Sequence, residues 1–412
     1  MTTFHWLPVA TDAAVRSRPW ATLALVAANL VAFGAVLGIR GNPGTMYALA
    51  FKAVDPTVWT AISSLFVHGG VLQLLGNMIV LSLFGPALEA RLGAFRYVTG
   101  YLVCGWLSNL AQAAAVLQWT PELSAIPIAG SDGAVSGILG IFAVRLSFAR
   151  LRLVSANALL REGAVRPARL AIPAALGIAV WFAAPVIARL AGADSGGTLV
   201  ARWSGGLFGA AFAIVMGLLP AARIERRLAV GALHEKRGDW HAALGEVEGY
   251  LRSLPDDPEA LAQAGRLFRV THQDAQAAEC FRRAIQSWLR RGDMRQACDA
   301  YQEMRRLLGS QAALPPVAQL RVARGFEDLG RASEASRAYE AYGREYPERH
   351  AAVLALLRSA DIERRALNNP GRARYIYEEL LRRDLPPDLA TMVRERKQVA
   401  ERALEQLPLG AV

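Results

Sequence analysis

The sequence predicts an all-α fold, a bundle of six transmembrane helices followed by a water-soluble α-solenoid, and two observations lead to it. First, 53% of the 412 residues are hydrophobic, and long apolar runs fill only the first 220 positions. Second, from Ala221 onward the chain carries 32 Lys and Arg beside 28 Asp and Glu, with apolar residues at helical spacing. We therefore predict a cytosolic N-terminal segment at 1–19, a membrane domain at 20–220 and a helical-repeat domain at 221–412.

Six apolar runs are candidate membrane spans, because a hydrocarbon core about 30 Å thick needs about 20 apolar residues per helix. The runs are Trp20–Ile39, Val71–Leu88, Tyr97–Trp119, Gly133–Val144, Leu170–Ile187 and Trp203–Pro220. The fourth run is short, which suits a helix that is buried among its neighbours.

Arginines distinguish the two ends of this predicted bundle. They gather before the first run, between the second and third, between the fourth and fifth, and after the sixth: Arg16, Arg18, Arg91, Arg96, Arg150, Arg152, Arg161, Arg166, Arg169, Arg223, Arg226 and Arg227. The opposite loops hold fewer: Arg40, Lys52, Arg189 and Arg202. The positive-inside rule then places both termini in the cytoplasm, which agrees with an even number of spans. We expect an integral multi-pass protein of a bacterial inner membrane, in contact with the lipid bilayer.

The net charge of +11 mostly reflects this topology. Residues 1–220 hold 14 of the 46 basic residues and only 7 of the 35 acidic ones. Because no basic stripe with interleaved aromatic residues stands out in the charged half, we expect no nucleic-acid partner. The three cysteines, Cys104, Cys280 and Cys298, share no metal-ligand spacing, so we predict reduced thiols and neither a metal nor a cofactor.

Four short stretches lie at or near the ends of the predicted spans. They are residues 66–78 (FVHGGVLQLLGNM), 84–93 (FGPALEARLG), 130–137 (GSDGAVSG) and 201–209 (ARWSGGLFG). Each alone is a weak signal, because small residues simply let helices approach closely in lipid. In this order, and on these helices, they resemble the second, fourth and sixth helices of the rhomboid intramembrane serine proteases. The resemblance implies a six-helix fold with a lateral opening that admits transmembrane helices.

The same resemblance points to the positions that carry the chemistry of that family. There, the fourth helix begins Gly-x-Ser-Gly with a nucleophilic Ser, and the sixth carries the His base in Ala-His-x-x-Gly-x-x-x-Gly. A His and an Asn on the second helix help to stabilise the oxyanion. Here Asp132 stands at the nucleophile position, Arg202 at the base position and Gln73 at the oxyanion His, whereas Asn77 matches. His68 also matches the family pattern, in a role that looks architectural.

Neither missing partner has a ready substitute. Ser131 and Ser136 are fallback nucleophiles, but a shift to either loses the motif, and Ser136 is better explained as a small packing residue. Arg202 cannot act as a base, since a guanidinium group stays protonated at neutral pH, and an aspartyl mechanism needs two neighbouring carboxylates. We hypothesise that Asp132 and Arg202 form an ion pair. The alternative is that Arg202 extends to the membrane surface while Asp132 only caps its helix.

A recurring unit follows residue 220: an alanine and, four positions later, an aromatic or large apolar residue. It occurs at Ala243 and Val247, Ala277 and Phe281, Ala297 and Tyr301, Ala335 and Tyr339, and Ala373 and Tyr377, at alanine intervals of 34, 20, 38 and 38. An interval near 34 resembles tetratricopeptide repeats, so we expect an irregular α-solenoid of about three to five repeats, with a longer loop at Gly309–Pro316. Such arrays offer a concave surface to protein partners. The alternative is that the repeats only dock against the membrane domain.

These patterns favour a rhomboid-like pseudoprotease that binds transmembrane helices and couples them to a cytosolic repeat platform for protein partners. The alternative is an active rhomboid intramembrane serine endopeptidase with displaced catalytic residues. A transporter is a weaker third hypothesis, because no pair of broken helices is evident.

Overall fold

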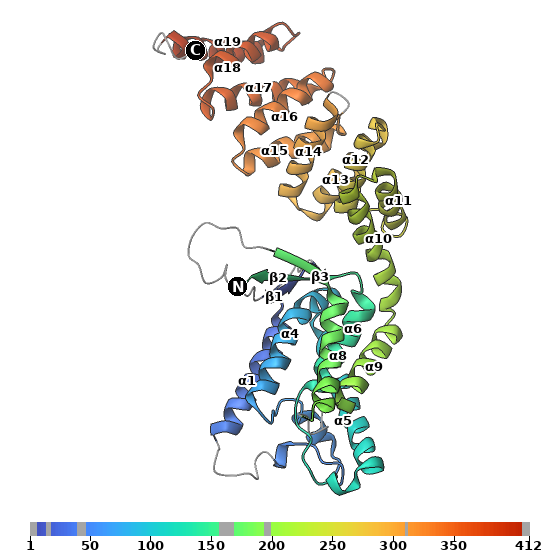
Figure 1. Cartoon of the computed structure of the whole chain (residues 1–412). Coiled ribbons are helices and arrows are strands. Elements are labelled where there is room, and N and C mark those ends of the chain that lie inside the picture. Colours follow the sequence, from blue (N-terminus) through green and yellow to red (C-terminus); the bar gives the residue numbers. More distant parts are fainter. Residues whose placement is uncertain are drawn as a thin grey trace, which may run out of the picture. The chain divides into compact units, whose positions relative to one another are not determined.

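The computed structural model describes residues 6–13, 18–38, 47–155, 169–192, 199–309 and 312–405. The chain divides into two compact units, Met1–Arg226 and Arg227–Val412, and the division falls within helix α10 (Leu218–Arg237). Figure 1 labels the elements of both units. Four of the arginines that predict the topology, Arg16, Arg40, Arg161 and Arg166, lie outside the described residues.

The first unit is built mainly from apolar helices. Its elements before α10 are β1 (Trp6–Thr11), α1 (Trp20–Gly38), α3 (Val58–Ser63), α4 (Val71–Leu92), α5 (Ala94–Trp119), a short 3-10 helix (Pro121–Leu123), α6 (Asp132–Arg145), β2 (Arg150–Ser155), β3 (Arg169–Pro173), α8 (Ala174–Leu190) and α9 (Leu199–Val215). A helix therefore lies at each of the six positions where the sequence predicts one.

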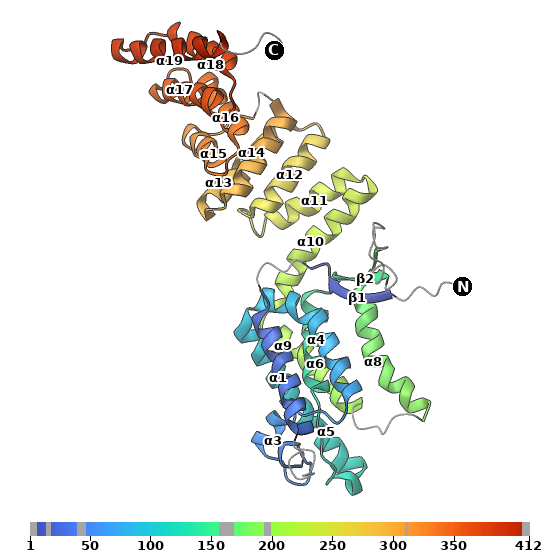
Figure 2. The ribbon, with the colours of Figure 1, turned by 90° about the vertical axis from the view of Figure 1, so that its left-hand side faces the viewer.

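Helix α6 lies at the centre of this unit and packs against α4, α5, α8 and α9 (Figures 1 and 2). Every residue from Asp132 to Phe142 is buried, and so is Arg145. The prediction that the short fourth helix is enclosed by its neighbours is confirmed.

Length and composition qualify only some of these helices as membrane spans. Among the described residues, α4 and α5 are long and apolar enough, and α9 with α10 makes a third if this bent pair is one span. Helices α1 and α8 are apolar but shorter. The first unit is thus a bundle with apolar helices, and its six complete spans stay a prediction.

Main chain contacts main chain where α6 meets α9. A methyl group added at Gly205 would lie 2.2 Å from the carbonyl oxygen of Gly133, and one added at Gly209 would lie 2.0 Å from that of Gly137. Only a residue without a Cβ atom permits this approach. The matching four-residue spacing on both helices sets the register in which the beginning of α6 faces the beginning of α9.

Glu89, near the end of α4, holds the beginning of α1. Its carboxylate accepts the N–H groups of Ala21 and Thr22 at 2.9 and 2.8 Å, and the Thr22 hydroxyl at 2.7 Å. The first N–H groups of a helix lack partners within the helix and carry partial positive charge, so they stabilise a carboxylate that is only 7% exposed.

A cluster of ion pairs lies at the end of the bundle where α4 and α6 finish. Glu225 of α10 lies 2.6 Å from the Arg145 guanidinium and 3.6 Å from that of Arg91. The Arg145 side chain is only 7% exposed, so its pairing with Glu225 offsets much of the cost of burying the charge. Basic segments that are distant in the sequence therefore meet at one end of the bundle.

The all-α prediction is wrong for one part of this unit, because three strands form an antiparallel sheet in the order β1-β2-β3. In β2, Leu151 pairs with Thr11 of β1 and with Ile172 of β3. Leu151 is buried whereas Arg152 is exposed, which is the period-two alternation of a strand. The arginines of β2 also suit a topology signal, so this short alternation is not distinctive in the sequence.

The fifth and sixth predicted runs also need new bounds. Leu170 belongs to β3, so helix α8 begins only at Ala174. Helix α9 begins before the predicted start at Trp203 and ends at Val215. Gly217 has a φ of 67°, a left-handed conformation that ends helices, and α10 continues at an angle of 88°.

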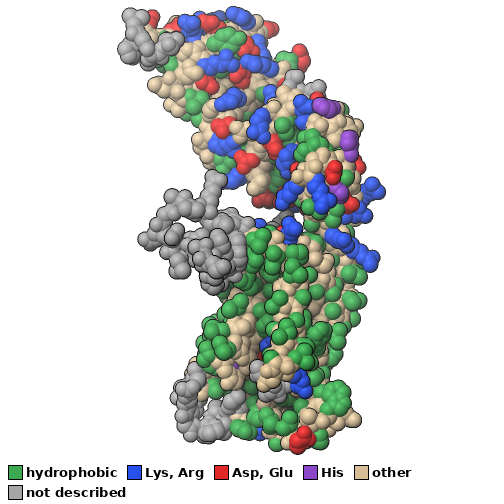
Figure 3. Space-filling model, viewed as in Figure 1, with side chains coloured by type: hydrophobic (Ala, Val, Ile, Leu, Met, Phe, Trp, Pro, Cys, Tyr) green, Lys and Arg blue, Asp and Glu red, His purple; other side chains and the backbone are tan. Residues whose placement is uncertain are grey.

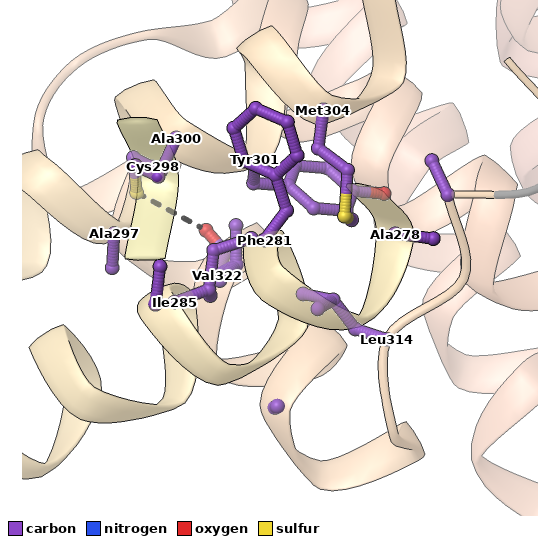
Figure 4. Packing of buried hydrophobic residues seen from close by; sticks show 14 of the residues in the cluster. Ala278, Phe281, Ile285, Ala297, Cys298, Ala300, Tyr301, Met304, Leu314 and Val322 are labelled. Carbon is purple, nitrogen blue, oxygen red and sulfur yellow. Dashed lines mark hydrogen bonds between the residues drawn. The ribbon is translucent and has the colours of Figure 1, made fainter. Parts of the chain in front are cut away.

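The second unit consists of antiparallel helices, each packed on the next. They are the end of α10, then α11 (Trp240–Leu251), α12 (Pro258–Val270), α13 (Asp274–Arg291), α14 (Met294–Leu308), α15 (Pro316–Asp328), α16 (Ala332–Glu345), α17 (His350–Arg365), α18 (Pro370–Leu381) and α19 (Pro387–Glu405). All ten positions of the recurring alanine and large-residue unit are buried. Figure 4 shows part of this core, with Phe281, Tyr301 and Met304 close together.

The irregular 20-residue interval has a structural explanation. Ala277 and Ala297 lie on the consecutive helices α13 and α14, whereas Ala335 and Ala373 lie on α16 and α18, with one helix between them. Helix α14 is therefore an extra helix between the hairpins α12–α13 and α15–α16. The array is helical and irregular, and its resemblance to tetratricopeptide repeats stays a prediction.

The surfaces of the two units differ in composition. On the face that Figure 3 shows, hydrophobic side chains cover most of the described part of the first unit, whereas Lys, Arg, Asp and Glu are dense on the second. All three cysteines are free thiols. Cys298 donates to the carbonyl of Val322 at 3.6 Å, the dashed line in Figure 4.

Candidate functional site

Asp132 is the first residue of α6, and donors from two other helices surround its carboxylate. From α9, Arg202 donates through Nε at 2.8 Å, and its Nη2 lies 2.7 Å from the same oxygen, Oδ1. The two side chains are 4% and 16% exposed. The hypothesised ion pair is present, and the alternative is wrong: the cap position of α6 is Ser131, and Arg202 points at Asp132.

Gln73 of α4 completes the surroundings of this carboxylate. Its Nε2 donates to Asp132 Oδ2 at 2.5 Å and lies 3.3 Å from the carbonyl of Ala129. Its Oε1 accepts the N–H of Gly69 at 3.1 Å. Because Oε1 already accepts a main-chain N–H, the amide is oriented with its NH2 group toward Asp132, and both oxygens of Asp132 are hydrogen-bonded.

Trp181 of α8 connects this pair to a third helix. The Arg202 guanidinium lies 4.3 Å from the centre of the indole ring, within the range of a cation–π contact. The indole N–H of Trp181 donates to Ser136 Oγ at 2.9 Å. Ser136 lies one turn after Asp132 on α6, so one tryptophan contacts both the ion pair and the helix that carries it.

A second polar cluster lies beside the first. Ser131 Oγ is 3.0 Å from His68 Nε2, and the Ser131 main-chain N–H points at the same nitrogen at 3.5 Å. Since an N–H group can only donate, Nε2 is the acceptor and the imidazole proton is on Nδ1. Asn77 Nδ2 donates to this nitrogen at 3.2 Å. Asn77 therefore orients His68 here.

Most of these side chains are buried, and Gln73, Trp181 and Arg202 are partly exposed. His68 is 2% exposed and Asp132 3%, whereas Asn77, Ser131 and Ser136 are fully buried. The hydroxyl of Ser136 accepts from Trp181, and that of Ser131 contacts His68. Among the described residues, no group of three or more His, Cys, Asp or Glu is arranged to hold a metal ion.

Comparison with known proteins names the region that carries this site. The family described as the Rhomboid domain matches residues 55–223, which include α3 to α9 and every residue of the site. This part of the chain is similar to the Rhomboid domain. Helix α1 precedes the matched range, and the repeats follow it.

Individual relatives cover the chain only in part. The putative rhomboid protease YdcA of Bacillus subtilis (strain 168) is 30% identical over 90 residues, which are 22% of this chain and 42% of that protein. The chain therefore matches less than half the length of this relative. The crystal structure of the MamA protein matches 46% of this chain and 97% of its own at 14% identity, with a TM-score of 0.19. A score this low does not establish a shared fold.

Within the matched range, the structure brings together the positions that the sequence singles out. Asp132, Arg202 and Gln73 meet in one hydrogen-bonded group, and Asn77 lies in the adjacent group with Ser131. Sequence reasoning missed two members, Trp181 and the pairing of His68 with Ser131. His68 was visible as a motif residue, but nothing in its spacing connects it to a serine 63 positions later.

Proposed function

We propose that this rhomboid-domain protein is a pseudoprotease, which binds transmembrane helices and couples them to a repeat platform for protein partners. The Asp132–Arg202 ion pair is the observation that carries the proposal. It stands where the family resemblance expects a nucleophile and a base. A carboxylate that accepts from Arg202 and Gln73 has both oxygens occupied, and a guanidinium cannot accept a proton at neutral pH. This pair therefore does not reproduce a serine nucleophile activated by a histidine base.

The remaining serines do not restore this chemistry easily. Within the described part of the chain, the side chain of Ser136 is hydrogen-bonded to the indole of Trp181, which is no base. A serine hydroxyl without a base is a poor nucleophile. The ion pair therefore has a structural role in this proposal, holding α6 and α9 together.

Helix binding is supported by the packing of α8. Only Ala174 and Pro185 of this helix are buried, although its sequence is strongly apolar. Val180, Ile187 and Leu190 are between 63% and 84% exposed, an apolar surface that suits lipid or another helix. We propose that a client helix lies against this part of the rhomboid domain.

The topology of the proposal has both termini in the cytoplasm of a bacterial cell, with the repeats as the cytosolic platform. The cluster of Arg91, Arg145 and Glu225 supports it, because it joins basic segments that the positive-inside rule assigns to one side.

Activity-based labelling tests the absence of catalysis. The purified full chain in lipid bilayers is treated with a serine-reactive fluorophosphonate and with single-span model substrates. We expect neither labelling nor cleavage. Labelling of the parent that disappears in Ser131→Ala or Ser136→Ala contradicts the proposal.

Restoring the catalytic residues of the family tests whether the Asp132–Arg202 pair is the cause of the lost activity. The triple variant Asp132→Ser, Arg202→His, Gln73→His restores the family motif at every substituted position. If the ion pair replaces a catalytic pair on an intact scaffold, fluorophosphonate labels this variant at position 132. The matched control, Arg202→His alone, stays unlabelled.

The alternative function is an active serine endopeptidase with displaced residues, and one observation favours it. The contact between Ser131 Oγ and neutral His68 Nε2 at 3.0 Å has the geometry of a hydroxyl beside a general base. Against it stands the complete burial of Ser131. Labelling that is lost in both Ser131→Ala and His68→Ala, but kept in Asp132→Asn, supports the alternative.

A further inference from the structure

A charged groove lies on the second unit, between helices α14, α16 and α18. It has a volume of about 1060 Å³, and its walls carry Arg305, Arg306, Arg337, Arg344 and Arg372. Pockets for small ligands are typically about 300–1,000 Å³, so this groove has room for several residues of an extended chain.

Carboxylates also line the groove, and arginines hold each of them already. Asp299 lies 2.5 Å from Arg331, which also reaches Glu334 at 3.2 Å. Glu303 lies 3.0 Å from Arg266. These three acids therefore pair with two arginines, Arg331 and Arg266, that do not line the groove.

The other two acids pair within the groove. Glu340, whose side chain is only 8% exposed, accepts from both Arg344 and Arg372 through one oxygen atom. Glu345 accepts from Arg305. Five carboxylates thus face seven guanidinium groups, counting Arg266 and Arg331, and the surplus charge is +2.

This surplus is located on two residues. Among the described residues, neither Arg306 nor Arg337 has a carboxylate partner, and both are exposed. Arg337 donates to the hydroxyl of Ser333 at 2.6 Å, and the Arg306 guanidinium has no hydrogen bond or ion pair with the other described residues. Each guanidinium offers a fork of N–H donors that matches a carboxylate.

The floor of the groove holds an unsatisfied donor. Tyr301 is 3% exposed, and its hydroxyl has no hydrogen-bond partner among the described residues. Burial raises the pKa of this phenol far above its ordinary value, so the hydroxyl keeps its proton. A buried hydroxyl without a partner costs free energy, and an acceptor group from a ligand would recover it.

We propose that this groove binds an acidic peptide segment of a partner protein, with Arg306 and Arg337 pairing with its carboxylates and Tyr301 donating to it. The proposal deepens the role of the repeats as a partner platform and rests on that role. A peptide fits better than a nucleic acid, because five carboxylates stand among the arginines of this wall and would repel a continuous run of phosphates. A nucleic acid favours a continuous basic surface with exposed aromatic rings, whereas Tyr301 and Phe326 are buried here.

Fluorescence anisotropy with the full chain in lipid nanodiscs tests the groove. The ligand is a labelled peptide of about eight residues that alternates Glu and Leu, an extended length of about 26 Å. Peptides with Gln or Lys in place of Glu, and an RNA oligonucleotide, are the comparisons. We expect binding of the Glu peptide alone, weakened by salt. Equal binding of the Gln or Lys peptide, or tighter binding of RNA, overturns the proposal.

Matched variants locate the binding. Arg306→Glu with Arg337→Glu should weaken the Glu peptide at least about tenfold. The control, Arg295→Glu with Arg394→Glu, makes the same charge change at exposed residues that do not line the groove, and should stay within about twofold of the parent. Equal loss in both double variants, or no loss in the first, contradicts the proposal.

Tyr301→Phe removes only the hydroxyl and should weaken the peptide about threefold or more while leaving the thermal unfolding of the repeats unchanged. An unaltered affinity overturns the role of Tyr301 even if a charge-reversed variant fails to fold. Fluorophosphonate labelling reports on the serines of the first unit and does not depend on the groove. The failure of the pseudoprotease proposal and the failure of the peptide-binding proposal are therefore distinguishable.

Discussion

The carboxylate of Asp132 receives hydrogen bonds from Arg202 and Gln73 while its side chain is only 4% exposed. In such surroundings the two charges depend on each other. Breaking a buried pair by removal of one member is far more damaging than removal of both, because a single substitution leaves an uncompensated charge. The cation–π contact of Arg202 with Trp181 stabilises the guanidinium further but does not neutralise its charge.

We therefore expect Asp132→Ala to lower the free energy of unfolding by about 3–5 kcal/mol in the parent, and by clearly less in a chain that already carries Arg202→Ala. Unfolding in mixed detergent micelles measures the four chains of this cycle. Additive losses would show that the two side chains are not coupled. Ser204→Ala, which removes a hydroxyl bonded only to its own helix, is the control on α9.

The thiols of the second unit should react slowly. Burial raises the pKa of Cys280 to about 11 and that of Cys298 to about 12. Both remain protonated near pH 8, whereas an ordinary thiol is partly thiolate there. Iodoacetamide labelling followed by mass spectrometry should modify Cys298, which is fully buried, more slowly than the half-buried Cys280.

The same shifts have a consequence for stability. A raised folded pKa means that stability is present below the ordinary thiol value and is lost as the pH rises toward about 11–12. Rapid labelling of Cys298 at pH 8 under native conditions would contradict its burial.

Among the helices, α6 and α9 are placed by glycines, and the ion pair at their beginnings depends on this placement. Gly209→Ala would bring a methyl group within 2.0 Å of the Gly137 carbonyl oxygen, so the helices must separate. We expect a loss of about 1–3 kcal/mol in the free energy of unfolding. Gly76→Ala on α4 has open space around its added methyl and should change stability by less than about 1 kcal/mol. Equal effects would show that the close approach is unimportant.

Helix α8 has few buried residues, and Trp181 provides its polar contact with the core. Trp181→Ala should increase hydrogen exchange across α8, measured in nanodiscs, while α6 stays protected. Trp181→Phe keeps the ring over Arg202 but loses the bond to Ser136, so an intermediate effect is expected. Trp119→Ala, at a residue 73% exposed, is the control. Unchanged exchange in Trp181→Ala would contradict this role of the tryptophan.

Hydropathy alone predicts the helices of the first unit, because a long apolar run is buried either in lipid or in protein. It could not find the sheet, since the alternation in β2 covers few residues and its arginines also suit a topology signal. The end of α9 depends on the left-handed Gly217, which looks like any other glycine in an apolar run. At the site, motif order predicted the ion pair, whereas Trp181 and the His68–Ser131 contact depend on how α8 and the loop before α4 pack.

For the molecule as a whole, charge divides the chain into an apolar part and a densely charged part. The meeting of Arg91, Arg145 and Glu225 at one end of the bundle supports a single cytoplasmic side for the basic segments. Fusion of green fluorescent protein to the C-terminus should give fluorescent cells, and fusion of alkaline phosphatase there should give inactive enzyme. Phosphatase activity at the C-terminus would contradict the topology. A phosphatase fused after Gly192, in the predicted fifth loop, is the positive control.

The hydrogen bonds from Ala21 and Thr22 to Glu89 also limit where the chain can be truncated. A fragment that starts at residue 55, where the family match begins, would lack α1 and leave the Glu89 carboxylate without its three donors. A carboxylate that loses its hydrogen-bond donors in a place with little water is costly. A fragment that is meant to contain the matched range should therefore begin ahead of Trp20. In a fragment that begins after α1, replacing Glu89 by Gln should raise the free energy of unfolding.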